Sequence, residues 1–213
     1  FMVYGTSYHA LVQRAGINKD DEVLVLGAAG GVGLAAVDIA KSFGARVVAA
    51  VSTKEKAEVC AGYGVDDVVV YGEEKLNKEG QKALTKELKS KSVRGGFSII
   101  YDPIGDCFAE PALRSIGWGG TYLVVGFAAG KIPSFPANLM LLKGCAVSGV
   151  FIGRFQQEEP EQNSQNLKEI GELLGGGKLT PFISETIPMA DSVAAIERIA
   201  KRGVVGKIVF VNS

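Results

Sequence analysis

The sequence predicts an α/β fold whose centre is a doubly wound parallel sheet of six strands. Short apolar runs rich in β-branched residues recur along the chain, which is typical of strands buried on both faces. Segments with helical spacing separate these runs, and a glycine-rich turn follows the first of them. Alternation of this kind requires right-handed crossovers, so we expect the strands to be parallel.

The first half of the chain predicts helices and strands in strict alternation. Gly44 is placed to end a helix, and Ser52 and Glu55 have the spacing of a capping box that opens the next one. In chain order the expected segments are helix 3–14, strand 22–26, helix 34–43, strand 46–51, a helix from 52 to about 62, and strand 68–71.

The second half predicts three further strands of the sheet and a tail that returns toward another domain. The polar stretch 156–165, which contains Pro160, is expected to be a loop. The other expected segments are helix 76–90, strand 97–101, a short helix, strands 121–125 and 145–152, helix 167–174, strand 182–187, a helix from 190, and strand 207–211.

The composition is that of an ordinary globular chain without charge imbalance. Among its 213 residues, Lys plus Arg and Asp plus Glu number 23 each, and 47% of the residues are hydrophobic. A neutral chain without a basic stripe favours neither nucleic acid nor a membrane surface as a partner. The three cysteines are far apart and His9 is the one histidine, which argues against the clustered ligands of a structural zinc site.

The glycine-rich turn has the pattern of a Rossmann-type dinucleotide site. Ala28-Ala29-Gly30-Gly31-Val32-Gly33 follows a predicted strand and opens a predicted helix, with Ala28 in place of the first turn glycine. Gly30 would let the backbone approach a pyrophosphate, and Gly33 would let the helix pack closely on the strand. A tight turn without a ligand is the alternative. A Walker phosphate loop is excluded because no Lys-Ser or Lys-Thr follows the last glycine.

The end of the second predicted strand indicates which nicotinamide cofactor fits. NAD sites carry Asp or Glu there to bind the ribose 2′-hydroxyl, whereas this chain has Val51-Ser52-Thr53. The Ser52 hydroxyl, the amides of the next helix and the Lys56 ammonium would suit a 2′-phosphate instead. The pattern therefore favours NADPH, although Ser52 is also expected to cap that helix.

Several motifs together resemble the medium-chain dehydrogenase/reductase superfamily, and within it the quinone oxidoreductase (zeta-crystallin-like) branch. They are the segment 4–11, the glycine turn, Asp102-Pro103-Ile104-Gly105, Gly119-Gly120 and the ending Gly206-Lys207-Ile208-Val209. The resemblance covers essentially the whole chain. It implies an NAD(P)-binding Rossmann domain at 1–160, and helices and strands at 161–213 that complete the fold. It also implies an N-terminal GroES-like catalytic domain absent from this chain, and the start at Phe1, inside a predicted helix, favours an excised part of a longer protein.

The resemblance assigns cofactor contacts one residue at a time. Lys56 and Tyr71 resemble the family residues that hold the 2′-phosphate, and Arg202 resembles a C-terminal arginine near it. Thr6 resembles the threonine beside the nicotinamide. The structural alternatives are a helix-internal bond for Thr6, packing for Tyr71 and a solvated helix-end cation for Arg202. Cofactor-bordering residues after the fifth and sixth strands are Gly126, Phe127, Phe151, Ile152 and Gly153.

By the same resemblance, the whole protein would transfer hydride from NADPH to a quinone or an activated alkene. It would do so without zinc, and as a homodimer paired through the sixth strand. The cofactor carries that chemistry, and no catalytic residue is assigned. We expect the isolated chain to bind NADPH but to turn over poorly, because half of the water-excluding cleft is missing.

Two other functions remain open: an enoyl-thioester reductase domain of a larger synthase, and a non-catalytic NADPH-binding module. A cytoplasmic location is expected, with mitochondria as the alternative.

Overall fold

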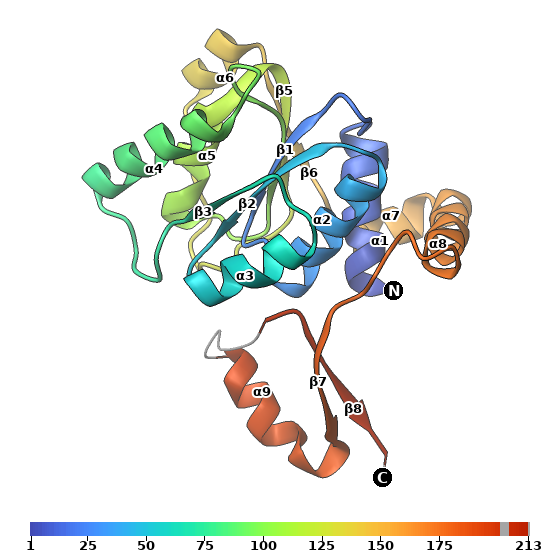
Figure 1. Cartoon of the computed structure of the whole chain (residues 1–213). Helices are drawn as coiled ribbons and strands as arrows, with labels where there is room; N and C mark the ends of the chain where they lie inside the picture. Colours follow the sequence, from blue (N-terminus) through green and yellow to red (C-terminus); the bar gives the residue numbers. More distant parts are fainter. Residues whose placement is uncertain (201–204, 213) are drawn as a thin grey trace.

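The sheet at the centre of the molecule has the predicted six parallel strands. The computed structural model describes residues 1–200 and 205–212. The strand order β3-β2-β1-β4-β5-β6, with parallel pairing, confirms the doubly wound Rossmann-type fold (Figure 1). The strands are β1 Glu22–Leu26, β2 Arg46–Val51, β3 Asp67–Val70, β4 Phe97–Asp102, β5 Ile116–Val124 and β6 Ala146–Gly149.

Helices cover both faces of the sheet because the strands are apolar on both sides. In β1, Val23 and Val25 join one buried core, whereas Leu24 and Leu26 join the other. The first core includes side chains of α1 Met2–Tyr8, η1 His9–Arg14, α2 Gly31–Ser42 and α3 Lys54–Gly62. The second includes side chains of α4 Lys78–Lys91, η2 Asp106–Phe108, α5 Ala109–Ser115 and α6 Ala137–Lys143. None of the helices in the described part of the chain is long and apolar enough to span a membrane.

The segment after β6 differs from the sequence prediction. Residues 156–165 lie largely in helices α7 (Ile152–Glu158) and α8 (Pro160–Gly175), so the expected loop is wrong. Pro160 occupies the first turn of α8, where its missing amide costs no helical hydrogen bond. The stretch is polar because these helices bury little of their surface, and a polar helix is easily taken for a loop.

Three further features differ from the sequence prediction: an additional helix, the end of β6 and the place of the expected domain boundary. Helix α6 lies where no element was predicted, and β6 ends at Gly149 rather than at residue 152. The expected domain boundary after residue 160 falls in the first turn of α8. That helix packs against α1, where the Tyr8 hydroxyl donates to Glu169 Oε2 at 2.6 Å. Helix α8 therefore packs on the same body as the sheet.

The C-terminal segment forms a small unit that projects from the body. Its strands β7 (Ile183–Pro188) and β8 (Lys207–Val211) pair in parallel, flanked by η3 (Met189–Asp191) and α9 (Ser192–Ala200) (Figure 1). Gly206 returns the chain to the glycine turn, where its amide donates to the Ala29 carbonyl oxygen at 2.9 Å. Exposed apolar side chains of this unit include Ile183, Met189, Val193, Ile196, Ile199 and Val211.

Candidate functional site

The carboxyl ends of four neighbouring strands open into one cavity of about 500 Å³. The glycine turn follows β1, Ser52 follows β2, Tyr71 follows β3, and Ile104 lies just beyond β4. Parallel strands gather these residues because their carboxyl ends meet at one edge of the sheet. The residues predicted from the sequence that line the cavity are Ala29, Gly30, Ser52, Lys56 and Tyr71.

The turn after β1 depends on two glycines. Gly27 has φ +57°, in the left-handed region, so Gly27 makes the tight turn, and the view of Ala28 as a replaced turn glycine is wrong. A Cβ on Gly33 would lie 2.3 Å from the Gly27 carbonyl oxygen and 2.8 Å from Ala28 Cα. A residue without a Cβ is therefore required for α2 to start this close to β1, as the motif predicts.

The first turn of α2 presents backbone amides and no competing anion. Gly30 is the N-cap, no side chain caps the helix, and the first turn holds no acidic residue. The amides and the helix dipole favour an anion at this position. Lys207 adds a cation nearby, since its Cγ and Cε each lie 3.6 Å from where a Cβ on Gly31 would be. This start of α2 is therefore suited to phosphate groups.

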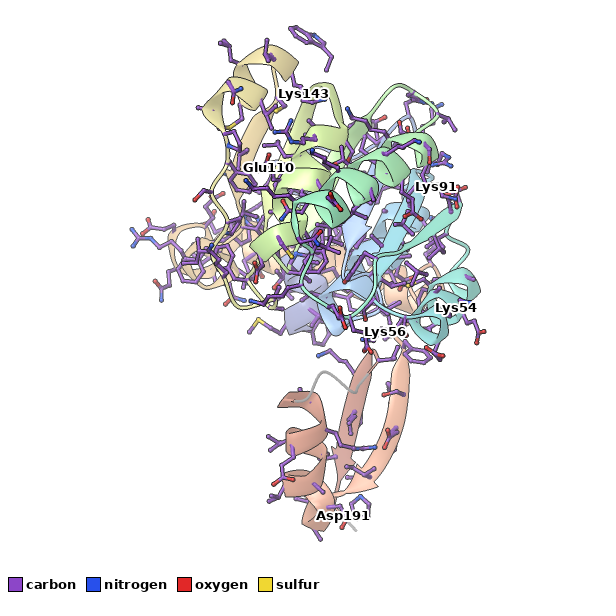
Figure 2. The ribbon with its side chains drawn as sticks, turned by 90° about the vertical axis from the view of Figure 1, so that its left-hand side faces the viewer. Lys54, Lys56, Lys91, Glu110, Lys143 and Asp191 are labelled. Carbon is purple, nitrogen blue, oxygen red and sulfur yellow. The ribbon has the colours of Figure 1, made fainter. Side chains whose placement is uncertain are left out.

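Ser52 and Lys56 form a polar pair at the end of β2. The Lys56 ammonium donates to Ser52 Oγ at 3.0 Å. Thr53, with extended backbone, is the helix cap, and its Oγ1 accepts from the Lys56 amide at 3.3 Å, so the predicted cap at Ser52 is wrong. Because Thr53 caps α3, the Ser52 hydroxyl is left to Lys56 and the cavity. Figure 2 shows Lys56 at the edge of the body that faces the C-terminal unit.

Tyr71 lies directly after β3, where it both packs against a neighbouring ring and lines the cavity. Its ring packs against Phe108, with the ring centroids 4.6 Å apart, which is the packing role expected as an alternative. Tyr71 also lines the cavity that Ser52 and Lys56 line. Packing therefore orients the ring without removing it from the site.

A buried carboxylate holds the loop after β4. Asp102 Oδ1 accepts from the amides of Ile104 and Gly105 at 2.8 Å each, and its Oδ2 accepts from the Tyr122 hydroxyl at 2.6 Å. Burial raises the pKa of Asp102, and these hydrogen bonds oppose the shift. Ile104 packs against the glycine turn, where a Cβ on Gly27 would lie 2.7 Å from Ile104 Cγ2. Asp102 thus fixes one wall of the cavity.

The other predicted site residues that the structure describes do not line this cavity. Thr6 is buried, and its hydroxyl donates to the Met2 carbonyl oxygen at 2.9 Å, which is the helix-internal bond expected as its alternative role. Phe127 and Phe151 have exposed side chains beyond β5 and β6. Arg202 lies outside the described residues. Cofactor contact stays a prediction for all of these and for Gly31, Val32, Gly33, Gly126, Ile152 and Gly153.

Sequence reasoning missed several residues of the site. Glu73 and Lys75 line the cavity in the loop after β3, a position that the strand order alone could have indicated. Ile199 and Lys207 come from the C-terminal unit; Lys207 lies in the ending motif but was given no role at the site, and no local signal marks Ile199. They reach the site because the chain returns to the glycine turn at Gly206.

Within residues 1–200 and 205–212, no group of three or more His, Cys, Asp or Glu side chains could hold a metal ion. The cysteines are free thiols, and burial raises the pKa of Cys60 to about 12. No metal ligand set therefore competes with the cavity as the candidate site in this part of the chain.

Comparison with known sequences gives one family across most of the chain. The family described as zinc-binding dehydrogenase matches residues 31–169. The chain is 35% identical over 210 residues to quinone oxidoreductase-like protein 2 of Bos taurus, which covers 97% of this chain and 57% of that protein. It is 28% identical over 213 residues to mycoketide-CoA synthase of Mycobacterium tuberculosis. That match covers 98% of this chain but 5% of the synthase. The chain thus spans little more than half of its quinone oxidoreductase-like relatives.

Solved structures show the same similarity. A mycobacterial protein complexed with NADPH is 25% identical, with a TM-score of 0.87, over 99% of this chain and 62% of that one. The quinone oxidoreductase of Thermus thermophilus, solved alone and with NADPH, is 27% identical, with a TM-score of 0.81, over 98% of this chain and 63% of that one.

Proposed function

Because this chain belongs to the zinc-binding dehydrogenase family, in the quinone oxidoreductase branch of the medium-chain dehydrogenases, we propose that it is the NADPH-binding domain of an oxidoreductase. One observation carries the proposal. A single cavity joins the glycine turn to Ser52, Lys56 and Tyr71, at the edge where the strands end. NADPH complexes of similar structures support the same choice of cofactor.

The residues present fit the adenosine and pyrophosphate parts of the cofactor. The missing Cβ atoms of the glycine turn and the uncapped amides of α2 suit the pyrophosphate. The strand β2 ends without a carboxylate, and the ammonium and hydroxyl of Lys56 and Ser52 offer charge-assisted hydrogen bonds to a 2′-phosphate. NADPH is therefore favoured over NADH.

The proposed reaction is transfer of a hydride to a quinone or an activated alkene. Bound NADPH supplies the hydride, and this chain supplies binding and orientation. Asp102 and Ile104 hold the wall beside the glycine turn, and the exposed Phe127 and Phe151 flank the open side beyond β5 and β6. A GroES-like domain packed on that side would complete the cleft and exclude water.

An enoyl-thioester reductase is the second candidate. Nearly all of this chain is similar to a small part of mycoketide-CoA synthase. This similarity favours the second candidate, because one domain of a large synthase would match in this way. Both reactions use the same cofactor site, so the substrate, and not the cofactor, separates them.

We also propose that two copies pair through β6. This strand is an edge of the sheet, and its backbone carries the unpaired groups that favour addition of another strand. Trp118, Leu141 and Leu142 are exposed nearby, and the Trp118 ring lies against Gly144, two residues before β6. An apolar patch beside an open sheet edge suits a second copy of the chain.

Calorimetric titration with NADPH and NADH tests the cofactor assignment. We expect tighter binding of NADPH, and Lys56→Ala should remove most of that preference because the 2′-phosphate loses its ammonium partner. Lys54→Ala is the matched control, since Lys54 begins the same helix but does not line the cavity (Figure 2). Equal affinity for the two cofactors, or equal effects of the two variants, would contradict the assignment.

A further inference from the structure

Lys75 and Asp106 form an ion pair at the adenosine end of the proposed cofactor cavity. Lys75 Nζ lies 2.9 Å from Asp106 Oδ2. Lys75 belongs to the loop after β3, and Asp106 begins η2 in the segment after β4. The Leu76 amide donates to Cys107 Sγ at 3.3 Å, so neighbouring residues join the same two segments. The pair is therefore part of a fixed connection across two strand ends.

The pair presents its cation to the cavity and buries its anion. The Lys75 side chain is 73% exposed, whereas that of Asp106 is 8% exposed. Lys75 lines the cavity and Asp106 does not. The Lys75 ammonium lowers the pKa of Asp106, so the carboxylate is charged at neutral pH and holds the lysine. A ligand in the cavity meets the ammonium first.

The backbone at Asp106 has an uncommon conformation that its surroundings determine. Asp106 has φ 53°, and among the described residues it is the one non-glycine in the left-handed region. Most side chains disfavour this conformation, and it persists where the surroundings determine it. Here the Asp106 amide donates to the Lys131 carbonyl oxygen at 3.0 Å, and Gly105 before it lies close to Phe127. The position of the Asp106 backbone is thus set independently of Lys75.

We propose that Lys75 is a second specificity-determining cation for the 2′-phosphate of the cofactor, and that Asp106 positions it. The inference rests on the proposed NADPH function. Lys56 provides one ammonium, but Glu73 brings a carboxylate to the same cavity. A 2′-phosphate dianion is bound well only where positive charge outweighs negative charge. Lys75 adds an ammonium group on the cavity side, beside Glu73, whereas Asp106 does not line the cavity and keeps the flexible lysine side chain at the rim.

The test is calorimetric titration of five proteins, namely the unmodified chain, three single variants and one double variant, with NADPH, NADH and 2′,5′-ADP. Lys75→Gln removes the charge at similar size, and Asp106→Asn keeps a residue that tolerates the left-handed backbone. Lys131→Gln is the matched control, because Lys131 is near Asp106 but does not line the cavity. We expect Lys75→Gln to weaken NADPH and 2′,5′-ADP about 5-fold and NADH little, as for loss of one partly exposed charge contact.

The role of Asp106 predicts a second, independent result. Asp106→Asn should weaken NADPH in the same direction as Lys75→Gln, and the double variant should be no worse than Lys75→Gln alone. Tighter NADPH binding by Asp106→Asn would mean that the carboxylate only screens the lysine, and would overturn the inference. An unchanged NADPH preference in Lys75→Gln, or an equal loss for NADH, would overturn it too. If the unmodified chain binds neither cofactor, the proposed function fails, and this inference fails with it.

Discussion

At the scale of single residues, buried hydroxyls and carboxylates hold the loops of the site in place. Ser7 Oγ donates to the Val32 carbonyl oxygen at 3.0 Å and lies 2.8 Å from the Tyr101 hydroxyl. Because the Ser7 proton is used by Val32, the Tyr101 hydroxyl is the donor of the second bond. This network ties α1 to the start of α2. Ser7 and Tyr101 therefore support the glycine turn, as Asp102 supports the wall beside it.

His9 makes the stability of the fold sensitive to acid. Its ring is buried and stacked on Phe155, with centroids 3.8 Å apart. Burial lowers the pKa of His9 below 6.5, and Arg14 lowers it further, while Gln13 and Glu159 oppose the shift. The folded state therefore disfavours the protonated ring, and the free energy of unfolding should fall as pH drops below about 6.5.

His9→Phe should flatten this pH dependence, because phenylalanine keeps the stack on Phe155 and cannot be protonated. Urea unfolding of both proteins at about pH 7.5 and about pH 5.5 measures the effect, within the range where histidine titrates. A variant that loses as much stability in acid as the unmodified chain would show that other groups cause the loss.

At the scale of elements, the close contact of β1 with α2 is the most demanding feature. Gly33→Ala would place a Cβ 2.3 Å from the Gly27 carbonyl oxygen, so α2 must move away from the strand. We expect a loss of stability of more than about 2 kcal/mol and loss of NADPH binding. Thermal unfolding and calorimetry measure the two effects.

The control for this prediction is Gly171→Ala in α8. A Cβ on Gly171 meets nothing within 4 Å, and the residue is exposed inside a helix. Alanine there should raise stability by about 0.5 to 1 kcal/mol, because glycine is the poorer helix former. If both variants behave alike, the contact between α2 and β1 does not limit the fold.

Elements with strong apolar periodicity agree with the sequence, and the polar segment around Pro160 does not. β1 and β2 have the predicted bounds, since buried strands read as unbroken apolar runs. Helix α7 and the first part of α8 were missed because their sequence is polar and contains Pro160, whereas the predicted helix 167–174 is the second part of α8. The cap of α3 was placed one residue early, because Ser52 and Thr53 both suit an N-cap and only the backbone at Thr53 decides between them.

At the scale of the whole molecule, the open edge at β6 and the patch beside it predict a dimer. Leu141 and Leu142 are 80% and 70% exposed, which is unfavourable for a lone copy in water. Leu141→Asp with Leu142→Asp should convert the dimer to a monomer in sedimentation velocity. Val93→Asp is the control, since Val93 is 69% exposed before β4, a strand in the interior of the sheet rather than at the β6 edge. A chain that sediments as a monomer before any substitution would refute the dimer.

By itself, the sequence determined the alternation of strands and helices, the glycine turn and the lack of a carboxylate after β2. These follow from local periodicity and residue type, which neighbouring residues decide. Only the tertiary structure decided that Gly27 makes the turn and that Lys75, Ile199 and Lys207 reach the site. The physical reason is that strand order and the return of the chain at Gly206 bring together segments far apart in sequence, and no local pattern records such contacts.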